Sequence, residues 1–224
     1  MKYYRHIAWD WNGTLMDDVW LSLRVINTLL GRRGIEAIDV EHYREVFGFP
    51  LRDYCQSLGF DFGRYSFEEL SDEFADLYEA RRCECALHIG VDPLFKQLLE
   101  RGCKLSLLSA YGDGKLCELV GFYGIGRYFS HVIGLDNEYG EGKVERGRRC
   151  MKELAWSADE MLYVGDTLHD FEVAEAMGID CVLVAAGHQT RERLETAGCP
   201  VVTDLNELSG FLLPPRAGDG CADG

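Results

Sequence analysis

The chain is short of positive charge. Its 224 residues include 23 lysine and arginine residues against 38 aspartate and glutamate residues, which gives a formal net charge of −15. Such a chain repels phosphate backbones and anionic lipids, so neither nucleic acid nor a membrane surface is expected as a partner. We expect small molecules, metals or other proteins instead, and the sequence leaves the oligomeric state open.

Long apolar runs and paired cysteine motifs are also missing. No apolar stretch approaches the about 20 residues of a membrane-spanning helix, and the first residues become polar too early for a signal peptide. The nine cysteines are scattered without a CxxC pair, which favours reduced thiols in the core over a zinc site or a disulfide framework. These features predict a cytoplasmic protein.

What the sequence does contain is a series of short apolar runs rich in branched residues. They are HIAW before Asp10, KLSLLSA at 104–110, HVIG at 131–134, MLYVGD at 161–166, DCVLVAAG at 180–187 and PVVTDL at 200–205. Between the later runs, FEVAEAM and ERLETAG have helical period and are followed by glycine or end at it. This alternation predicts an α/β fold, in which helices cover both faces of a Rossmann-like parallel sheet.

Residues 17 to about 90 interrupt the alternation. They contain three amphipathic segments, DVWLSLRVINTLLGRRG, LRDYCQSLG and SFEELSDEFADLYEARR, with turn signals between them. We therefore predict an α/β core domain of residues 1–16 and 91–213. An α-helical cap domain of residues 17–90 is inserted after the first strand, and residues 214–224 form a flexible C-terminal tail.

Polar residues stand where predicted strands end. Asp10, Ser109 and Asp166 close three apolar runs, and Asp170 lies one helical turn after Asp166. Each alone is equally well explained as a turn former or a helix cap. Ligands of open α/β sheets, however, bind beyond the carboxyl ends of the strands. Carboxylates that converge there repel one another unless a cation lies among them, so the set predicts an oxygen-ligated metal, Mg²⁺.

Four ordered stretches, DWNGTL, LLSA, EGKVERG with Lys143, and VGDTLHD, resemble the motifs of the haloacid dehalogenase-like hydrolase superfamily, in its phosphoglycolate-phosphatase-like branch. The resemblance runs from residue 7 to about 190 and includes the position of the helical insert, which matches the mobile cap of that branch. It implies that Asp10 is a nucleophile, which attacks phosphorus to form an aspartyl-phosphate.

The same resemblance implies roles for the other motif residues. Ser109, Ala110 and Lys143 would bind the phosphoryl oxygens, where charge is spread in the transition state. The metal ligands would be Asp10, the backbone carbonyl of Asn12, Asp166 and Asp170. Taken singly, Ser109 is equally well explained as a helix cap, Lys143 as a solvated charge and Asp170 as an exposed acid.

Asn12 departs from the family pattern. Phosphatases of this family have an aspartate there, which protonates the leaving oxygen and later deprotonates the attacking water. An amide cannot exchange a proton near neutral pH, although it still forms hydrogen bonds. Three alternatives follow. The substrate could be an acyl or aryl phosphate, whose leaving group needs little protonation. A different acid could replace the aspartate, with Asp17, Asp18 or a substrate group as candidates, or the phosphorylated state could persist as a signal. Asp17 and Asp18 are more simply explained as caps of the first helix of the insert.

The loop GFPLRDY occupies the place of a specificity loop in the family. It would bring Phe49 and Arg52 to the substrate, since arginine can bind an anionic group away from the phosphate. A surface arginine after a structural turn explains the pattern equally well.

Two sister chemistries of the superfamily fit less well. Phosphonate cleavage relies on a lysine in the cap, and there is no lysine between Lys2 and Lys96. Dehalogenation usually lacks the acidic pair that Asp166 and Asp170 supply. The prediction is therefore a Mg²⁺-dependent phosphohydrolase of small phosphorylated metabolites. The alternative is a catalytically weak phosphate-binding or regulatory module, which Asn12 supports.

Overall fold

The computed structural model describes residues 2–135 and 142–213. The predicted C-terminal tail, residues 214–224, lies outside this described part of the chain.

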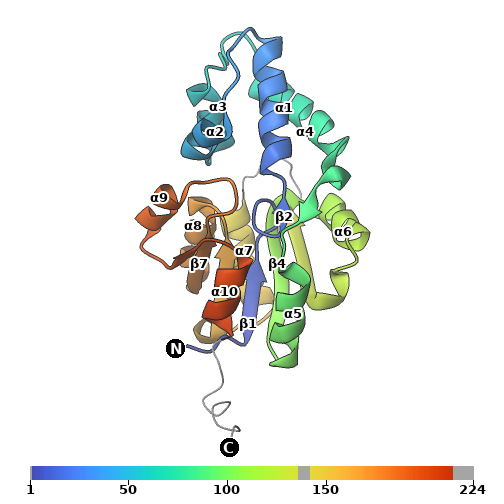
Figure 1. Cartoon of the computed structure of the whole chain (residues 1–224), viewed down its shortest axis with the longest axis vertical. Helices are drawn as coiled ribbons and strands as arrows, with labels where there is room; N and C mark the ends of the chain where they lie inside the picture. Colours follow the sequence, from blue (N-terminus) through green and yellow to red (C-terminus); the bar gives the residue numbers. More distant parts are fainter. Residues whose placement is uncertain (1, 136–141, 214–224) are drawn as a thin grey trace, which may run out of the picture.

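Within the described residues, six parallel strands form the central sheet in the order β5-β4-β1-β6-β7-β8 (Figure 1). They are β1 His6–Trp9, β4 Lys104–Gly112, β5 Phe129–Leu135, β6 Met161–Gly165, β7 Asp180–Val184 and β8 Val201–Val202. Because every neighbouring pair is parallel, the carboxyl ends of all six strands lie at one edge. The predicted α/β fold is confirmed.

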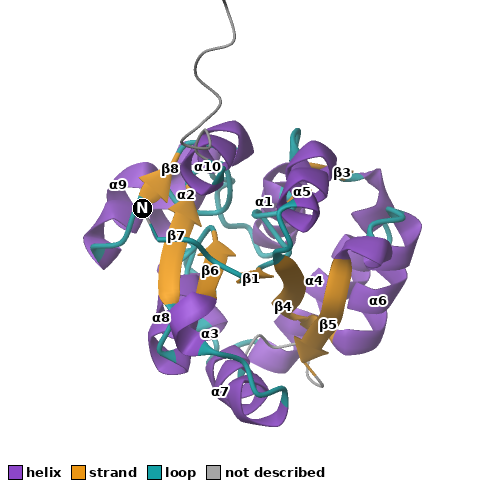
Figure 2. Cartoon of the chain, turned by 90° about the horizontal axis from the view of Figure 1, so that it is seen from below, coloured by secondary structure: helices purple, strands orange, loops and turns teal. Residues whose placement is uncertain are grey.

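Both faces of the sheet are buried, which explains why its strands have short continuous apolar runs. In β1, Ile7 and Trp9 pack into the core on one face, and Ala8 packs into the core on the other. Figure 2 shows α5 and α10 on one side of the sheet, and α7 and α8 on the other. The helices of this part are α5 Val91–Glu100, α6 Asp113–Phe122, α7 Lys143–Glu153, α8 Leu168–Met177, α9 Arg191–Leu194 and α10 Leu205–Leu212.

Four helices lie together beyond the carboxyl ends of the strands, at the top of Figure 1. They are α1 Val19–Arg32, α2 Val40–Val46, α3 Leu51–Ser57 and α4 Phe67–Glu79, and we call them the helical insert. The strand β2 Met16–Asp17 pairs antiparallel with β3 Ala86–Leu87, so the chain enters and leaves the insert at one place. The interpretation of residues 17–90 as a separate cap domain stays a prediction.

The longest helix among the described residues, α1, has 14 residues. No helix in this part of the chain is long and apolar enough to cross a membrane. Five cysteines are buried, namely Cys55, Cys85, Cys103, Cys150 and Cys181, whereas Cys83 and Cys117 are exposed. Several thiols thus belong to the core, as predicted.

The first turn of α4 is closed by a capping box. The Ser66 hydroxyl accepts a hydrogen bond from the Glu69 amide, and the Glu69 carboxylate accepts one from the Ser66 amide. We expect Ser66→Ala to lower the free energy of unfolding in urea by about 1 kcal/mol, because it removes one cap bond. Ser157→Ala is the matched control, since Ser157 precedes a short helix without a side-chain cap bond. Equal losses in the two variants would contradict this prediction.

Candidate active site

Three predicted metal ligands meet beyond the ends of β1 and β6. Asp10 follows β1, Asp166 follows β6, and Asp170 lies in the first turn of α8. One oxygen atom of each carboxylate lies within 4.8 Å of the other two, and all three residues are buried. A donor set made only of buried carboxylate oxygens fits a hard divalent cation, so the cluster can bind a metal.

Lys143 supplies the positive charge inside this cluster. Its Nζ donates to Oδ1 of Asp10 and to Oδ1 of Asp170, each at 2.6 Å, and the residue is only 3% exposed. The alternative explanation of Lys143 as a solvated surface charge is therefore excluded. Three carboxylates and one ammonium still leave two negative charges, which a divalent cation would balance.

Burial is the largest influence on the pKa values of the three carboxylates, and the neighbouring charges add to it or oppose it. Burial raises the pKa of Asp10 to about 8 against the opposing effect of Lys143, and the Asp170 and Asp166 carboxylates add to the rise. Burial likewise raises the pKa of Asp166 to about 6. Burial also acts to raise the pKa of Asp170, but Lys143 and the Thr167 hydroxyl outweigh it and lower that pKa. Asp170 is thus the carboxylate that the protein's own groups stabilise as an anion.

The DWNGT turn holds Asp166 in place. The Thr14 hydroxyl donates to Oδ1 of Asp166 at 2.8 Å, and the backbone amide of His188 donates to Oδ2 at 2.7 Å. Gly13 has a φ of +71°, and a Cβ atom on Gly13 or Gly187 would overlap the Asp166 carboxylate. The two glycines are therefore required by the close approach of this side chain.

Asp170 is fixed by the local structure of the VGDTLHD motif. Its Oδ2 accepts hydrogen bonds from the Thr167 amide at 2.9 Å and the Thr167 hydroxyl at 2.7 Å, within a capping box that opens α8. The alternative explanation of Asp170 as an exposed acid is excluded, because this residue is only 1% exposed. Because Oδ2 of Asp170 makes the cap hydrogen bonds, its Oδ1 accepts the hydrogen bond from Lys143.

Ser109 and Ala110 lie on β4 and line the same cavity as Asp10 and Lys143. Ser109 is buried, and its Oγ accepts a hydrogen bond from the Tyr111 amide at 3.1 Å. The strand continues to Gly112 instead of ending at Ser109. The structure therefore brings the predicted nucleophile and the predicted phosphate-binding residues together.

The Asn12 side chain is engaged by a second group of residues. Its Nδ2 donates to Oδ2 of Asp18 at 2.9 Å and to the Tyr78 hydroxyl at 2.8 Å. The Tyr78 hydroxyl in turn donates to Oδ2 of Asp18 at 2.6 Å. Both N–H groups of the amide are thus used, and an aspartate at position 12 would face the Asp18 carboxylate. This contact explains why an amide suits this position.

The preferred interpretation of Asp18 as a helix cap holds for its position but not for its side chain. Asp18 occupies the N-cap position of α1, but its side chain makes no cap hydrogen bond. Its Oδ1 instead accepts from the Gly13 amide at 2.7 Å and lies 3.3 Å from Nε2 of His188. Burial acts to raise the pKa of Asp18, but His188 and the donors Tyr78 and Asn12 outweigh it and lower that pKa.

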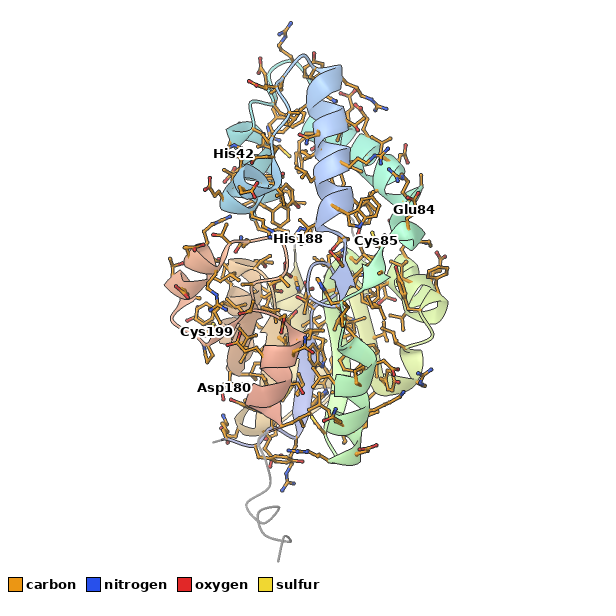
Figure 3. All side chains as sticks on the ribbon, in the orientation of Figure 1. His42, Glu84, Cys85, Asp180, His188 and Cys199 are labelled. Atoms are coloured by element: carbon orange, nitrogen blue, oxygen red, sulfur yellow. The ribbon has the colours of Figure 1, made fainter. Side chains whose placement is uncertain are left out.

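His188 and Tyr43 are site residues that the sequence patterns did not identify. Figure 3 shows His188 where the helical insert meets the ends of the strands. Nδ1 of His188 lies 2.8 Å from the Tyr43 hydroxyl on α2. Burial lowers the pKa of His188, but the contact with Asp18 outweighs it and raises the pKa to about 9. The sequence did contain a signal for His188. This residue directly follows the apolar run DCVLVAAG at 180–187, just as Asp166 ends the apolar run of β6.

A cavity of about 230 Å³ lies between the helical insert and the carboxylate cluster. Phe49 of the predicted specificity loop lines it, together with Asp10, Ser109 and Lys143. Arg52 is not brought to the cavity. Its guanidinium lies over the rings of Phe62 and Phe67, at 4.8 and 5.9 Å from their centroids. A role for Arg52 in substrate binding stays a prediction.

The fold and the motif residues agree with the comparison with known proteins. Residues 7–184 match the model of the haloacid dehalogenase-like hydrolases. The chain belongs to this family. A solved structure of a predicted phosphatase from Clostridium acetobutylicum, 21% identical, superimposes with a TM-score of 0.79 over 95% of this chain and 99% of that one.

Curated relatives within the haloacid dehalogenase-like family have different activities. A phosphoglycolate phosphatase of Pseudomonas fluorescens is 26% identical, with 95% of this chain and 81% of that protein covered. A 5'-nucleotidase of Pseudomonas aeruginosa is 27% identical over 85% and 87% of the two chains. A tyrosine-protein kinase, PtkA of Mycobacterium tuberculosis, is 24% identical over 88% and 67%. The predictions of the family and of a phosphatase enzyme are confirmed.

The pair formed by Asp18 and His188 makes stability depend on pH. The folded chain retains a proton on His188 up to about pH 9, whereas an ordinary histidine loses it near 6.5. The protonated His188 therefore contributes fully to the free energy of unfolding below pH 6.5, and this contribution is lost as the pH rises through 9. The loss is no more than about 1.4 kcal/mol per pH unit. We expect the free energy of unfolding to fall more steeply over this interval in the wild type than in His188→Gln.

The exposed His42 provides the control for this measurement (Figure 3). His42→Gln should keep the wild-type slope. An unchanged slope in His188→Gln would show that the Asp18 contact does not hold the proton.

The contact between Asn12 and Asp18 predicts the effect of restoring the family's aspartate. Asn12→Asp places a second carboxylate against buried Asp18, so we expect the free energy of unfolding at pH 7 to fall by about 3 kcal/mol. The loss should shrink near pH 5, because one of the two carboxyl groups then binds a proton. The double variant Asn12→Asp/Asp18→Asn exchanges amide and carboxylate and should recover most of the stability. A single variant as stable as the wild type would refute the repulsion.

Proposed function

We propose that this protein is a Mg²⁺-dependent phosphohydrolase of small phosphorylated metabolites, which acts through an aspartyl-phosphate at Asp10. The supporting observation is the buried cluster of Asp10, Asp166 and Asp170, in which Lys143 contacts Asp10 and Asp170 and which borders a cavity. The phosphoglycolate phosphatase and 5'-nucleotidase activities of the relatives support a small phosphorylated substrate. The net charge of −15 argues against nucleic acid as a partner.

In this mechanism a carboxylate oxygen of Asp10 attacks phosphorus while the bond from phosphorus to the leaving oxygen breaks. Lys143 and Ser109 bind the equatorial oxygens and hold the phosphoryl group in line with Asp10. Water then attacks the same phosphorus atom, which releases phosphate and restores the Asp10 carboxylate. Mg²⁺ held by Asp10, Asp166, Asp170 and the backbone carbonyl of Asn12 would neutralise negative charge on the phosphoryl oxygens.

Asn12 limits which substrates suit this mechanism. Its two N–H groups are already used by Asp18 and Tyr78, so the amide offers no proton to a leaving oxygen. General acid–base catalysis contributes about 10²- to 10⁴-fold to a rate, and leaving groups that need protonation lose this contribution. Aryl and acyl phosphates, whose leaving oxygens need little protonation, are therefore the favoured substrates.

The same observation favours a second function, a phosphate-binding or regulatory module with weak turnover. In that case phosphorylated Asp10 persists, because no aspartate at position 12 activates the hydrolytic water. The two functions differ in steady-state turnover, which only the phosphohydrolase sustains.

A Mg²⁺-dependent assay with phenyl phosphate and acetyl phosphate tests the proposed mechanism. Asp10→Asn should abolish turnover, because the amide cannot form the intermediate. Asp166→Ala should raise the Mg²⁺ concentration needed for half-maximal rate by at least about tenfold, because one charged ligand is lost. Asp17→Asn is the control, since Asp17 is exposed on β2 and should keep the wild-type rate. Substantial turnover by Asp10→Asn would rule out the covalent intermediate.

A further inference from the structure

The part of the cavity formed by the helical insert is predominantly apolar. Side chains from all four of its helices or their connections line it, among them Ile26, Leu29, Phe47, Phe49, Leu70 and Phe74. Ligand sites of this kind bind apolar groups through burial and use a few polar atoms for orientation. The reactive end of the cavity has the opposite character, because Asp10, Lys143 and Asp166 gather there. The two ends therefore fit a molecule with one phosphate and one apolar group.

The insert offers no cation to a second anionic group. Among its residues that line the cavity, the charged one is Glu79. Its carboxylate pairs with Arg82 at 2.8 Å and lies 3.8 Å from Nζ of Lys115. Two cations from outside the insert, Lys115 and His188, also line the cavity, but they already face Glu79 and Asp18. A substrate carboxylate or second phosphate inside the insert would therefore compete with these partners for a positive charge, which is costly.

One polar atom in this apolar region lacks a partner. The Tyr54 hydroxyl is buried and has no hydrogen-bond partner among the described residues, and Tyr54 lines the cavity. The residue is only 7% exposed. A buried hydroxyl without a partner costs stability unless a ligand satisfies it.

The dimensions of the cavity set the size of the organic group. About 230 Å³ lies below the range of about 300–1,000 Å³ that is usual for sites of drug-sized ligands. The cavity must also hold the phosphate beside Lys143. What remains fits a single ring or a short branched chain better than a nucleoside.

We propose that the substrate is a phosphate monoester of a neutral, mainly apolar phenol of about one-ring size, with one hydrogen-bonding group that meets the Tyr54 hydroxyl. This inference rests on the proposed phosphohydrolase function of the same cavity. It implies that phosphates that carry a carboxylate, such as phosphoglycolate, are not the substrates of this protein.

Binding of phosphonates that are not turned over tests the inference without relying on hydrolysis. Benzylphosphonate carries the neutral ring, and phosphonoacetate carries a carboxylate in its place. In calorimetric titrations of the full chain with Mg²⁺, we expect benzylphosphonate to bind at least about tenfold more tightly. Equal or tighter binding of phosphonoacetate, or failure of both to bind, would overturn the inference.

The hydroxylated isomers of benzylphosphonate test the role of Tyr54. At least one of the three ring isomers should bind the wild type about five- to tenfold more tightly than the parent compound, as one buried hydrogen bond provides. Tyr54→Phe should lose this advantage and keep its affinity for benzylphosphonate. Tyr65→Phe, which removes an exposed hydroxyl, is the matched control and should keep the advantage.

Two further results separate a failure of this inference from a failure of the proposed function. The unfolding temperature of Tyr54→Phe should not fall below that of the wild type, because the lost hydroxyl has no protein partner. If the phosphonate preference holds while no phosphate monoester is hydrolysed, the ligand class stands and the phosphohydrolase function fails. If monoesters are hydrolysed but phosphonoacetate binds more tightly, the function stands and the ligand class is refuted.

Discussion

The contact of Lys143 with both Asp10 and Asp170 is the interaction on which the rest of the site depends. Without it, Asp10 and Asp170 would lose the cation that contacts them both, and burial would favour their protonated forms. With it, Asp170 is held as an anion, while burial and its neighbours still raise the pKa of Asp10. The remaining excess of negative charge would favour the binding of a divalent cation. The glycines that let Asp166 approach closely serve the same cluster.

A second buried network joins the helical insert to the strand ends. Tyr78 on α4 and Tyr43 on α2 reach Asp18 and His188, so the insert contributes hydrogen bonds to the surroundings of Asn12. A shift of α4 would break both bonds of the Tyr78 hydroxyl, to Asn12 and to Asp18. The position of the insert and the orientation of the Asn12 amide are therefore linked, and the same contacts tie the insert to the strand ends beside the cavity. The proposed specificity and the environment of the proposed nucleophile, Asp10, would thus have a common structural basis.

The sequence predicted the parts of the site that depend on local pattern. Asp10 and Asp166 were recognisable because each ends a short apolar run, and parallel strands bring their carboxyl ends to one edge. In the second network only His188 carried a sequence signal, because the contacts join residues far apart in the chain, such as Tyr78 with Asp18 and Tyr43 with His188. The short helix α2, which carries Tyr43, was also missed, although Asp39 caps it by accepting a hydrogen bond from the His42 amide.

The most direct test of our interpretation is to look for the phosphoryl group on Asp10. The wild-type protein with Mg²⁺ is mixed with acetyl phosphate, quenched in acid within milliseconds to seconds, digested and mapped by mass spectrometry. Because Asn12 cannot take a proton from the attacking water, hydrolysis of the intermediate should be slow and the aspartyl-phosphate should accumulate. We expect the mass of one phosphoryl group on the peptide that contains Asp10, and none in Asp10→Asn. Turnover of acetyl phosphate without a modified Asp10 peptide, or with the phosphoryl group on another residue, would contradict the mechanism.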